Sequence, residues 1–276
     1  MKYVILGGVA AGTKAAAKLK RCDRSADVKV YTKGEDISYA GCGLPYYIGG
    51  DIPNRESLIV NTPARYFGLT GAEVFTGCEA TGIDADRKTV SLKRSSGGSF
   101  EETYDKLIIA TGAVPFIPPV DGTSLPGVFC IRTPDDAVNA RAYAQEQKCR
   151  RAVVCGAGFI GLEVAENLKK AGKNVSVVEA AGQVMNPFDY DMSQILHKEL
   201  CDNDVELILR DGIKAITEDK VILNSERELP ADVVVLAIGV LPETTLAKEA
   251  GLEIGETGAI KVTADFRTSD PHIYAV

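Results

Sequence analysis

The chain has 276 residues, of which 45% are hydrophobic and 25% charged, and its formal net charge is −7. This length allows two domains of ordinary size, and the composition is that of a soluble globular protein. The negative balance argues against a nucleic-acid or acidic-membrane partner. The longest apolar stretches, such as residues 233–238, are too short to span a bilayer. The opening residues, MKYVILGGVAAG, predict a β-strand and a glycine-rich turn rather than a signal peptide.

Seven cysteines are scattered along the chain, and no two of them form a CxxC pair. They are Cys22, Cys42, Cys78, Cys130, Cys149, Cys155 and Cys201. The odd number and the spacing argue against a disulfide framework and against a zinc site, so no metal is expected. A reducing cytoplasm is the expected compartment. Any chemically active thiol must therefore be identified from its local surroundings.

One pattern of strand, glycine-rich turn, alanine-rich helix and second strand occurs twice. The first copy comprises residues 3–6, 7–12, 13–21 and 28–32, and the second comprises 152–155, 156–161, 162–171 and 175–179. Each copy has roughly the 30 residues of a βαβ unit. The repeat predicts an α/β fold with two doubly wound, Rossmann-like dinucleotide-binding domains.

The stretch between the two copies is rich in short strands. Strands are expected at 73–75, 88–93, 99–103 and 107–110, with a polar hairpin turn at 95–99. The proline-rich run 115–119 fits a stiff crossover to the second domain. Residues 233–238 predict another buried strand, and 258–276 predict strand, loop and strand.

The second glycine motif, GAGFIG, is a complete GxGxxG between a strand and a helix. Gly156 makes the tight turn, Gly158 lets a pyrophosphate approach the backbone, and Gly161 lets the helix pack on the strand. The helix N-terminus supplies N–H groups to the phosphates. Glu179 follows 18 residues later, where a carboxylate accepts hydrogen bonds from a ribose 2′-OH and repels a 2′-phosphate. The motif predicts NADH binding in preference to NADPH; the alternative is a tight turn without a ligand.

The first motif, GGVAAG, is less complete. Gly7 and Gly12 hold the outer glycine positions, but Val9 holds the middle one. The following strand ends in Thr32, which lacks the bidentate reach of a carboxylate toward an adenosine ribose. A structural turn without a ligand is therefore the alternative here as well.

Cys42 lies between two glycines in the segment SYAGCGLPYYIGG, residues 38–50. A helix is expected to begin near Leu44, because proline suits a first helical turn. A thiol just before a helix N-terminus is partly stabilised as the thiolate. No second cysteine follows within ten residues, so the redox partner would be a sulfenate or a mixed disulfide with a small thiol. The alternative is a buried, inert thiol.

Seven segments, found in this order, resemble one family. They are GGVAAG, SYAGCGLPYYIGG, LIIATGAVP, GAGFIGLEVAE, QVMNPFDYDMSQILHKEL, LAIGVLPET and TSDPHIYAV. Together they are similar to the single-cysteine branch of the FAD-dependent pyridine nucleotide–disulfide oxidoreductases. That branch holds coenzyme A-disulfide reductases, NADH oxidases and NADH peroxidases. The resemblance covers the whole chain.

The resemblance implies that hydride passes from NADH through FAD to a disulfide between Cys42 and coenzyme A. It implies FAD contacts at Gly7, Ala11, Gly12, Lys33, Ala80, Ala110, Thr111 and Gly112. It implies NADH contacts at Gly156, Gly158, Phe159, Ile160, Gly161, Glu163, Glu179 and Gly239, with Phe159 as an aromatic gate. It implies coenzyme A contacts at Lys14, Lys18, Arg21 and Ser38, although the cations could equally form a solvated helix face.

The resemblance also implies the division of the chain. The FAD-binding domain is expected at 1–115 and 244–276, and the NADH-binding domain at 116–243. In the family, IYAV is followed by a Gly-Asp motif and a dimerisation domain. The FAD domain is thus expected to be incomplete, the C-terminal domain absent, and the full-length form a homodimer. Thr32, Gly41 and Leu241 depart from the usual Glu, Asn and Arg of the family.

Three functions remain open on the sequence. The first is a coenzyme A-disulfide or persulfide reductase. The second is an NADH oxidase or peroxidase in which Cys42 cycles through a sulfenate. The third is a nucleotide-binding fragment without turnover.

Overall fold

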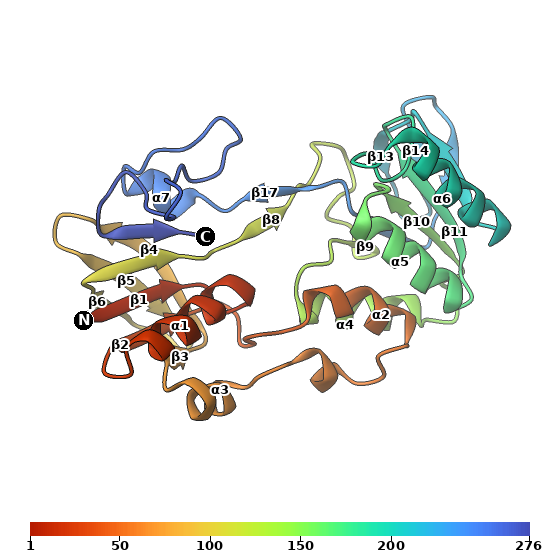
Figure 1. Ribbon diagram of the computed structural model, residues 1–276. Helices are drawn as coiled ribbons and strands as arrows, with labels where there is room; N and C mark the ends of the chain where they lie inside the picture. Colours follow the sequence, from red (N-terminus) through yellow and green to blue (C-terminus); the bar gives the residue numbers. More distant parts are fainter. The chain divides into compact units, whose positions relative to one another are not determined.

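The computed structural model describes all 276 residues, which group into two compact units. Unit 1 comprises Met1–Tyr39, Ile59–Val114 and Leu241–Val276, and unit 2 comprises Ala40–Leu58 and Pro115–Val240. Where the chain passes between them, β8 (Ala113–Pro115) and β17 (Val240–Pro242) pair as a two-stranded sheet. Each unit combines helices with a parallel sheet, which confirms the predicted α/β fold (Figure 1).

The central sheet of unit 1 has five parallel strands in the order β18-β7-β1-β2-β3. Their bounds are β1 (Lys2–Leu6), β2 (Asp27–Tyr31), β3 (Glu73–Phe75), β7 (Lys106–Ile109) and β18 (Ile273–Ala275). Chain order reverses beside β1, since β2 lies on one side of it and β7 on the other. A ligand crevice forms at such a switch point, outside the carboxyl ends of the strands.

Both faces of this sheet are covered, which explains why its strands are nearly continuous apolar runs. On one face, Ile5 and Val30 pack with Ala16 of α1 (Ala10–Cys22) and Tyr66 of α3 (Pro63–Thr70). The other face packs against α7 (Thr245–Glu249) and an antiparallel sheet. The strands of that sheet are β4 (Cys78–Asp84), β5 (Thr89–Arg94) and β6 (Ser99–Thr103).

Unit 2 repeats this plan. Its parallel sheet has the order β12-β11-β10-β16-β9. The bounds are β9 (Val128–Phe129), β10 (Arg151–Cys155), β11 (Asn174–Glu179), β12 (Glu206–Leu209) and β16 (Val233–Leu236). A second antiparallel sheet covers one face, with strands β13 (Ile213–Ile216), β14 (Lys220–Leu223) and β15 (Glu228–Pro230). The helices are α2 (Leu44–Gly49), α4 (Pro134–Ala144), α5 (Phe159–Lys170) and α6 (Tyr190–Asp202).

The segment Ala40–Leu58 groups with unit 2, whereas the sequence-based domain boundaries put it within the first domain. Its packing explains the grouping. Gly49 at the end of α2 lies so close to α5 that a Cβ there would be 2.7 Å from the Asn167 Cβ. Arg141 on α4 stacks on the Tyr47 ring and donates to the Ile52 carbonyl oxygen at 3.1 Å. The grouping changes from unit 1 to unit 2 after Val114 and back to unit 1 after Val240.

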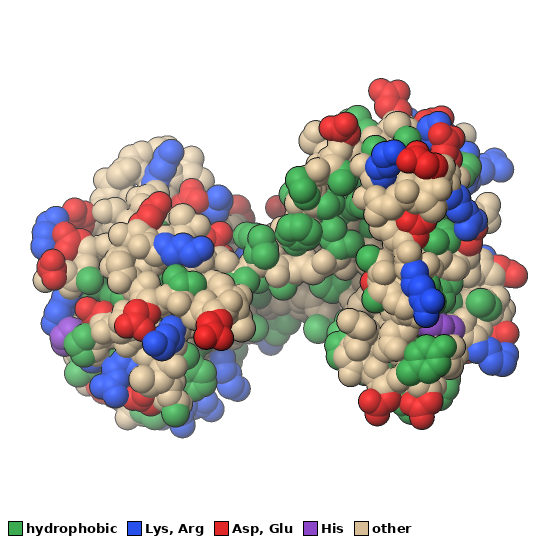
Figure 2. All heavy atoms as spheres, turned by 90° about the horizontal axis from the view of Figure 1, so that it is seen from above, with side chains coloured by type: hydrophobic (Ala, Val, Ile, Leu, Met, Phe, Trp, Pro, Cys, Tyr) green, Lys and Arg blue, Asp and Glu red, His purple; other side chains and the backbone are tan.

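The surface carries charges of both signs. Lys and Arg side chains are interspersed with Asp and Glu side chains on the face shown in Figure 2. No helix is long and apolar enough to cross a bilayer. No group of three or more His, Cys, Asp or Glu side chains is arranged to hold a metal ion.

Glu102 on β6 connects the two sheets of unit 1. Its carboxylate accepts a hydrogen bond from the Tyr31 hydroxyl and pairs with Lys2 and Lys29. Burial alone raises the pKa of Glu102, but the hydrogen bonds from Lys2, Tyr31 and Lys29 outweigh it and lower the pKa to about 2. The carboxylate therefore stabilises the fold in its charged form.

We predict that Glu102→Gln lowers the free energy of unfolding by about 2 kcal/mol at pH 7, because the substitution leaves two half-buried lysines without their anion. The stabilising effect is fully present above the unfolded-state pKa of Glu and is lost as pH falls toward about 2. Chemical denaturation measures the free energy of unfolding of variant and wild type at pH 7 and at pH 3. The difference in this free energy between variant and wild type should be smaller at pH 3. Glu101→Gln, which removes an exposed partner of Arg87, is the control and should cost under about 0.5 kcal/mol. Equal stability of Glu102→Gln and wild type at pH 7 would contradict the prediction.

Candidate functional site

The glycine motif of unit 2 forms the turn between β10 and α5. Gly156 has φ +101°, in the left-handed region, and a Cβ there would lie 2.3 Å from the Ala237 carbonyl oxygen. A Cβ on Gly161 would lie 1.9 Å from the Gly156 carbonyl oxygen. Both positions therefore require glycine for backbone packing alone. This packing brings the N-terminus of α5 to the carboxyl end of the central strand.

Gly158 differs from its two neighbours in the motif. No atom lies within 4 Å of the position that a Cβ would take. Gly158 is the N-cap of α5, and no side chain caps the first amides of the helix. These amides are free to bind an anion, and the missing side chain leaves room for one. The turn thus fits the pyrophosphate of a dinucleotide.

Glu179 stands at the carboxyl end of β11, beside this turn. One carboxylate oxygen accepts the Ala157 N–H and the other accepts the Ala181 N–H, each at 2.8 Å. The two bonds fix the orientation of the carboxylate, and each oxygen keeps a lone pair for a ribose hydroxyl. The structure places Glu179 and the glycine motif together, as the spacing in the sequence suggested.

The other residues expected at the nicotinamide dinucleotide also lie in unit 2. Phe159 is 63% exposed and meets the Phe188 ring edge-on at 6.3 Å between centroids. Burial raises the pKa of the Glu163 carboxyl, and the nearby Glu166 adds to this effect. Gly239 has φ +121°, and no atom lies within 4 Å of the position that a Cβ would take. Ile160, in the first turn of α5, is 43% exposed.

The glycine motif of unit 1 has the same backbone packing. Gly7 has φ +116°, and its Cβ would lie 2.0 Å from the Ala110 carbonyl oxygen. A Cβ on Gly12 would lie 1.9 Å from the Gly7 carbonyl oxygen. Val9 is the N-cap of α1 and offers no side-chain hydrogen bond, so the first amides remain open to a phosphate.

Thr32 occupies the strand-end position that corresponds to Glu179. Its side chain is only 8% exposed and packs toward Gly8, where a Cβ would lie 3.0 Å from the Thr32 Cβ. At this end of the sheet Thr32 therefore makes a packing contact and supplies no carboxylate. The phosphate part of the turn fits a flavin dinucleotide, whereas the ribose part lacks an acid.

The remaining residues expected at the flavin lie in unit 1 around the same switch point. Thr111 donates its hydroxyl to the Glu243 carbonyl oxygen at 2.8 Å, and Gly112 has φ +71°. Lys33 pairs with Glu79 at 2.8 Å on an exposed surface, next to Ala80 on β4. Ala11 is exposed in the first turn of α1.

Cys42 lies in a 3₁₀ turn (Gly41–Gly43) that leads into α2 at Leu44, as predicted. Its side chain is exposed, so the structure excludes a buried thiol at this position. A Cβ on Gly41 would meet nothing within 4 Å, whereas Gly43 packs against Ile52 and Leu58. The chain before Cys42 therefore leaves the thiol accessible, and the chain after Cys42 is held in place by packing.

The other cysteines have different surroundings. Burial raises the pKa of Cys155 to about 12, and burial also raises the pKa of Cys130 and of Cys149. Cys78 is buried, and Cys22 and Cys201 are exposed on helices. Cys42 is the one cysteine with glycine on both sides in the chain.

A basic hollow of about 610 Å³ lies in unit 1 beside α1 and the end of α3. It is lined by Lys14, Ala17, Lys20, Arg21, Arg24, Leu69, Thr70 and Gly71. Lys14 and Arg21 were expected at coenzyme A and meet here, whereas Lys18 and Ser38 are not in the lining. Lys20 and Arg24 also line the hollow and were not predicted from the sequence. Arg24 lies beyond the end of α1, so no helical spacing connects it with Lys14 and Arg21.

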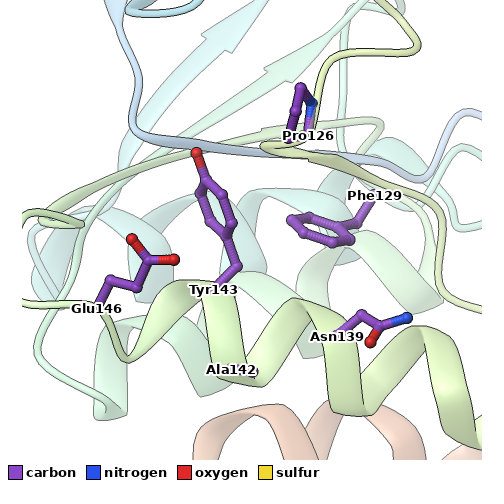
Figure 3. Close-up of a pocket in the computed structure, with 6 residues that line it drawn as sticks. All are labelled: Pro126, Phe129, Asn139, Ala142, Tyr143 and Glu146. Atoms are coloured by element: carbon purple, nitrogen blue, oxygen red, sulfur yellow. The ribbon is translucent and has the colours of Figure 1, made fainter.

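A second hollow, of about 440 Å³, lies in unit 2 between α4 and β9 (Figure 3). Phe129 and Tyr143 form one side of it, with ring centroids 5.5 Å apart in an edge-on arrangement. The neighbouring Glu146 pairs with Lys148 at 3.2 Å. None of the residues predicted from the sequence lines this hollow.

The two glycine turns define the class of protein. Each stands at the carboxyl end of a central parallel strand, leaves helix amides open and lies at a switch point in strand order. An α/β protein with two such turns binds two dinucleotides.

The chain belongs to the pyridine nucleotide-disulphide oxidoreductase family, which matches residues 1–276. FAD and NADH, the cofactors of this family, are both dinucleotides, and each turn fits the phosphates of such a ligand. Sequence resemblance and the family match therefore agree.

The proteins similar to this chain are longer than it is. It is 39% identical to the NADH oxidase of Methanocaldococcus jannaschii over all of its own length and 62% of the relative. It is 35% identical to the NAD(P)H coenzyme A polysulfide/persulfide reductase of Pyrococcus horikoshii, covering 99% of this chain and 61% of the relative. The structure of reduced Bacillus anthracis CoADR-RHD matches with a TM-score of 0.97 and 42% identity, over 100% of this chain and 50% of that one. The chain thus spans about half to three fifths of these relatives.

We predict opposite effects for two glycines of the GAGFIG turn. Gly158→Val should leave the free energy of unfolding within about 0.5 kcal/mol of wild type, because the site is open, yet weaken NAD⁺ binding at least about tenfold. Gly161→Ala should destabilise the fold by about 2 kcal/mol, because its Cβ would meet the Gly156 backbone. Chemical denaturation and titration calorimetry with NAD⁺ measure the two effects. NAD⁺ affinity unchanged in a folded Gly158→Val variant would show that the pyrophosphate binds elsewhere.

Proposed function

We propose that this chain is the flavin- and nicotinamide-binding part of an NADH-dependent oxidoreductase that reduces a disulfide or persulfide of coenzyme A at Cys42. In this proposal residues 1–115 and 244–276 would bind FAD, and residues 116–243 would bind NADH. When bound, the flavin supplies two-electron chemistry between NADH and the sulfur substrate. The two electrons cleave the bond between the Cys42 sulfur and the coenzyme A sulfur, which gives the Cys42 thiolate and the free coenzyme A thiol.

The basic hollow of unit 1 carries the coenzyme A part of the proposal. Coenzyme A bears a 3′-phosphate and a pyrophosphate, and clustered Lys and Arg side chains attract and hydrogen-bond such groups. Lys14, Arg21 and Arg24 are exposed at this hollow. Lys20 is held by the carbonyl oxygens of Arg24 and Ala26, each at 2.9 Å. A local basic surface on a chain of net charge −7 favours a polyanionic ligand. The persulfide reductase of Pyrococcus horikoshii, named for coenzyme A, supports the same choice.

The surroundings of Cys42 support its role as the redox thiol. Its exposure lets a substrate disulfide reach the sulfur, and Gly41 adds no side chain that would block the approach. The next cysteine along the chain is Cys78, which is buried. An external thiol, rather than a second cysteine of this chain, is therefore the proposed partner of the mixed disulfide.

A second candidate function is that of an NADH oxidase or peroxidase. An exposed single thiol is the residue type that cycles between thiolate and sulfenate, and the relative from Methanocaldococcus jannaschii is named an NADH oxidase. In either case the proposed substrates are small molecules, with no nucleic-acid or membrane partner. We also propose a cytoplasmic location and a homodimer for the full-length form. Nucleotide binding without turnover is the third outcome that the experiments below can reveal.

We predict that Arg21→Ala/Arg24→Ala weakens coenzyme A binding to this chain at least about tenfold, because two phosphate-binding cations are lost. Arg87→Ala/Lys93→Ala removes one cation from the turn before β5 and one from β5 itself, and it should change the affinity less than about twofold. Titration calorimetry at low and high salt measures both variants, and wild-type affinity should fall with salt. Equal losses in the two double variants would remove the support for this hollow.

We predict that coenzyme A disulfide accelerates NADH oxidation by the full-length protein and that Cys42→Ser abolishes this acceleration, since serine cannot form the mixed disulfide. Cys201→Ser, at an exposed cysteine on α6, is the control and should behave as wild type. No acceleration by coenzyme A disulfide would overturn the reductase proposal. Oxygen- or peroxide-dependent oxidation that survives Cys42→Ser would overturn the sulfenate alternative. Flavin absorbance without any NADH oxidation would leave nucleotide binding without turnover as the remaining function.

A further inference from the structure

A free guanidinium lies next to the loop that carries Glu179. Arg210 follows directly after β12, and its Nε lies 3.2 Å from the position of a Cβ on Gly182. Gly182 is three residues beyond Glu179 in the loop after β11. The cation is therefore placed at the strand ends where the adenosine ribose of the nicotinamide dinucleotide is expected.

The backbone holds Arg210 at this place. Its N–H donates to the Ala181 carbonyl oxygen at 2.9 Å, and the Asp211 N–H donates to the Glu179 carbonyl oxygen at 3.3 Å. Arg210 also has φ +57°, a left-handed conformation that arginine seldom adopts. The two loops are thus tied together, and the arginine side chain starts from a fixed point beside the Glu179 loop.

No carboxylate of the chain neutralises Arg210. Both oxygens of Glu179 accept backbone N–H groups. The neighbouring Asp211 accepts hydrogen bonds from Ser225 and Gly212 instead. Glu206, four residues earlier on β12, pairs with Arg227. The Arg210 side chain is exposed and remains available to an external anion.

The loop that follows Glu179 begins with small residues. Ala180, Ala181 and Gly182 are the only residues in the loop before Gln183, and the Gln183 amide is occupied by the Phe188 carbonyl oxygen at 2.8 Å. No long side chain of this loop therefore stands in the way of a phosphate that approaches Arg210 from the ribose.

We propose that Arg210 is a specificity-determining residue that binds the 2′-phosphate of NADPH, so that this chain accepts NADPH as a second, weaker coenzyme beside NADH. The proposal rests on the proposed binding of NADH by unit 2. Glu179 disfavours the 2′-phosphate by charge repulsion, whereas the planar guanidinium of Arg210 can hold two phosphate oxygens at once. The balance of these two residues sets how strongly NADH is preferred.

The test uses this chain and two adenosine probes, 2′,5′-ADP and 5′-AMP, which differ only in the 2′-phosphate. We expect wild type to bind both probes. Arg210→Ala should weaken 2′,5′-ADP binding at least about tenfold and change 5′-AMP binding less than about twofold. NADP⁺ and NAD⁺ should follow the same pattern. Titration calorimetry measures all four ligands without flavin or turnover.

Three further variants test whether the guanidinium of Arg210 itself is responsible for the effect. Arg210→Lys keeps the charge but loses the fork and should retain part of the 2′,5′-ADP affinity. Arg210→Gly relaxes the left-handed backbone and should lose as much affinity as Arg210→Ala, which separates the guanidinium from loop strain. Lys214→Ala removes a cation of the same unit that pairs with Glu226 and should leave all four affinities unchanged.

Several outcomes would overturn the proposal. Equal weakening of 5′-AMP and 2′,5′-ADP would assign Arg210 to the common adenosine part. Unchanged 2′,5′-ADP binding in both Arg210→Ala and Arg210→Gly would exclude any role of the guanidinium. Wild type that binds NAD⁺ and 5′-AMP but not 2′,5′-ADP would refute the Arg210 proposal alone. Failure of NAD⁺ and 5′-AMP to bind at all would instead refute the proposed NADH role of unit 2.

Discussion

The close approach of two backbones at each glycine turn is the constraint on which both units depend. In unit 2 the Gly161 Cα faces the Gly156 carbonyl oxygen, and in unit 1 the Gly12 Cα faces that of Gly7; a Cβ at either position would lie 1.9 Å from the oxygen. This approach lets each helix begin directly at the end of the central strand. Helix amides and strand ends then meet at one place, which is the condition for binding a phosphate group and a ribose of the same ligand. The strand order in both sheets follows the same plan.

The local pattern predicted the parallel sheets well because their strands are buried on both faces and read as apolar runs. Strands β1, β7, β10 and β16 were all found near their expected residues. The antiparallel sheet of unit 2 was missed, because β13 and β15 are short and three of their seven residues are exposed. The grouping of Ala40–Leu58 with unit 2 was missed for another reason. It depends on long-range contacts such as Arg141 with Tyr47, which no local pattern reveals.

The candidate site shows the same division between local and long-range information. Glycine spacing and a strand-end acid are local signals, so Gly158 and Glu179 could be identified from the sequence alone. Arg24 at the basic hollow and Arg210 beside the Glu179 loop could not be identified in this way. Arg24 requires knowledge that the end of α3 closes the hollow, and Arg210 requires the pairing of β11 with β12. Residues that act through the ends of neighbouring strands are visible only once the strand order is known.

The two units share one backbone design but differ at two positions where a dinucleotide is proposed to bind. The middle position of the turn is open at Gly158 and carries a valine side chain at Val9. The strand-end position carries an oriented carboxylate at Glu179 and a buried hydroxyl at Thr32. Neither substitution disturbs the contact of helix and strand, since that contact is made by the outer glycines. Selection on these two positions can therefore change which nucleotide each unit binds without changing how either unit folds. This separation of folding residues from ligand residues explains how one βαβ plan serves twice in the same chain.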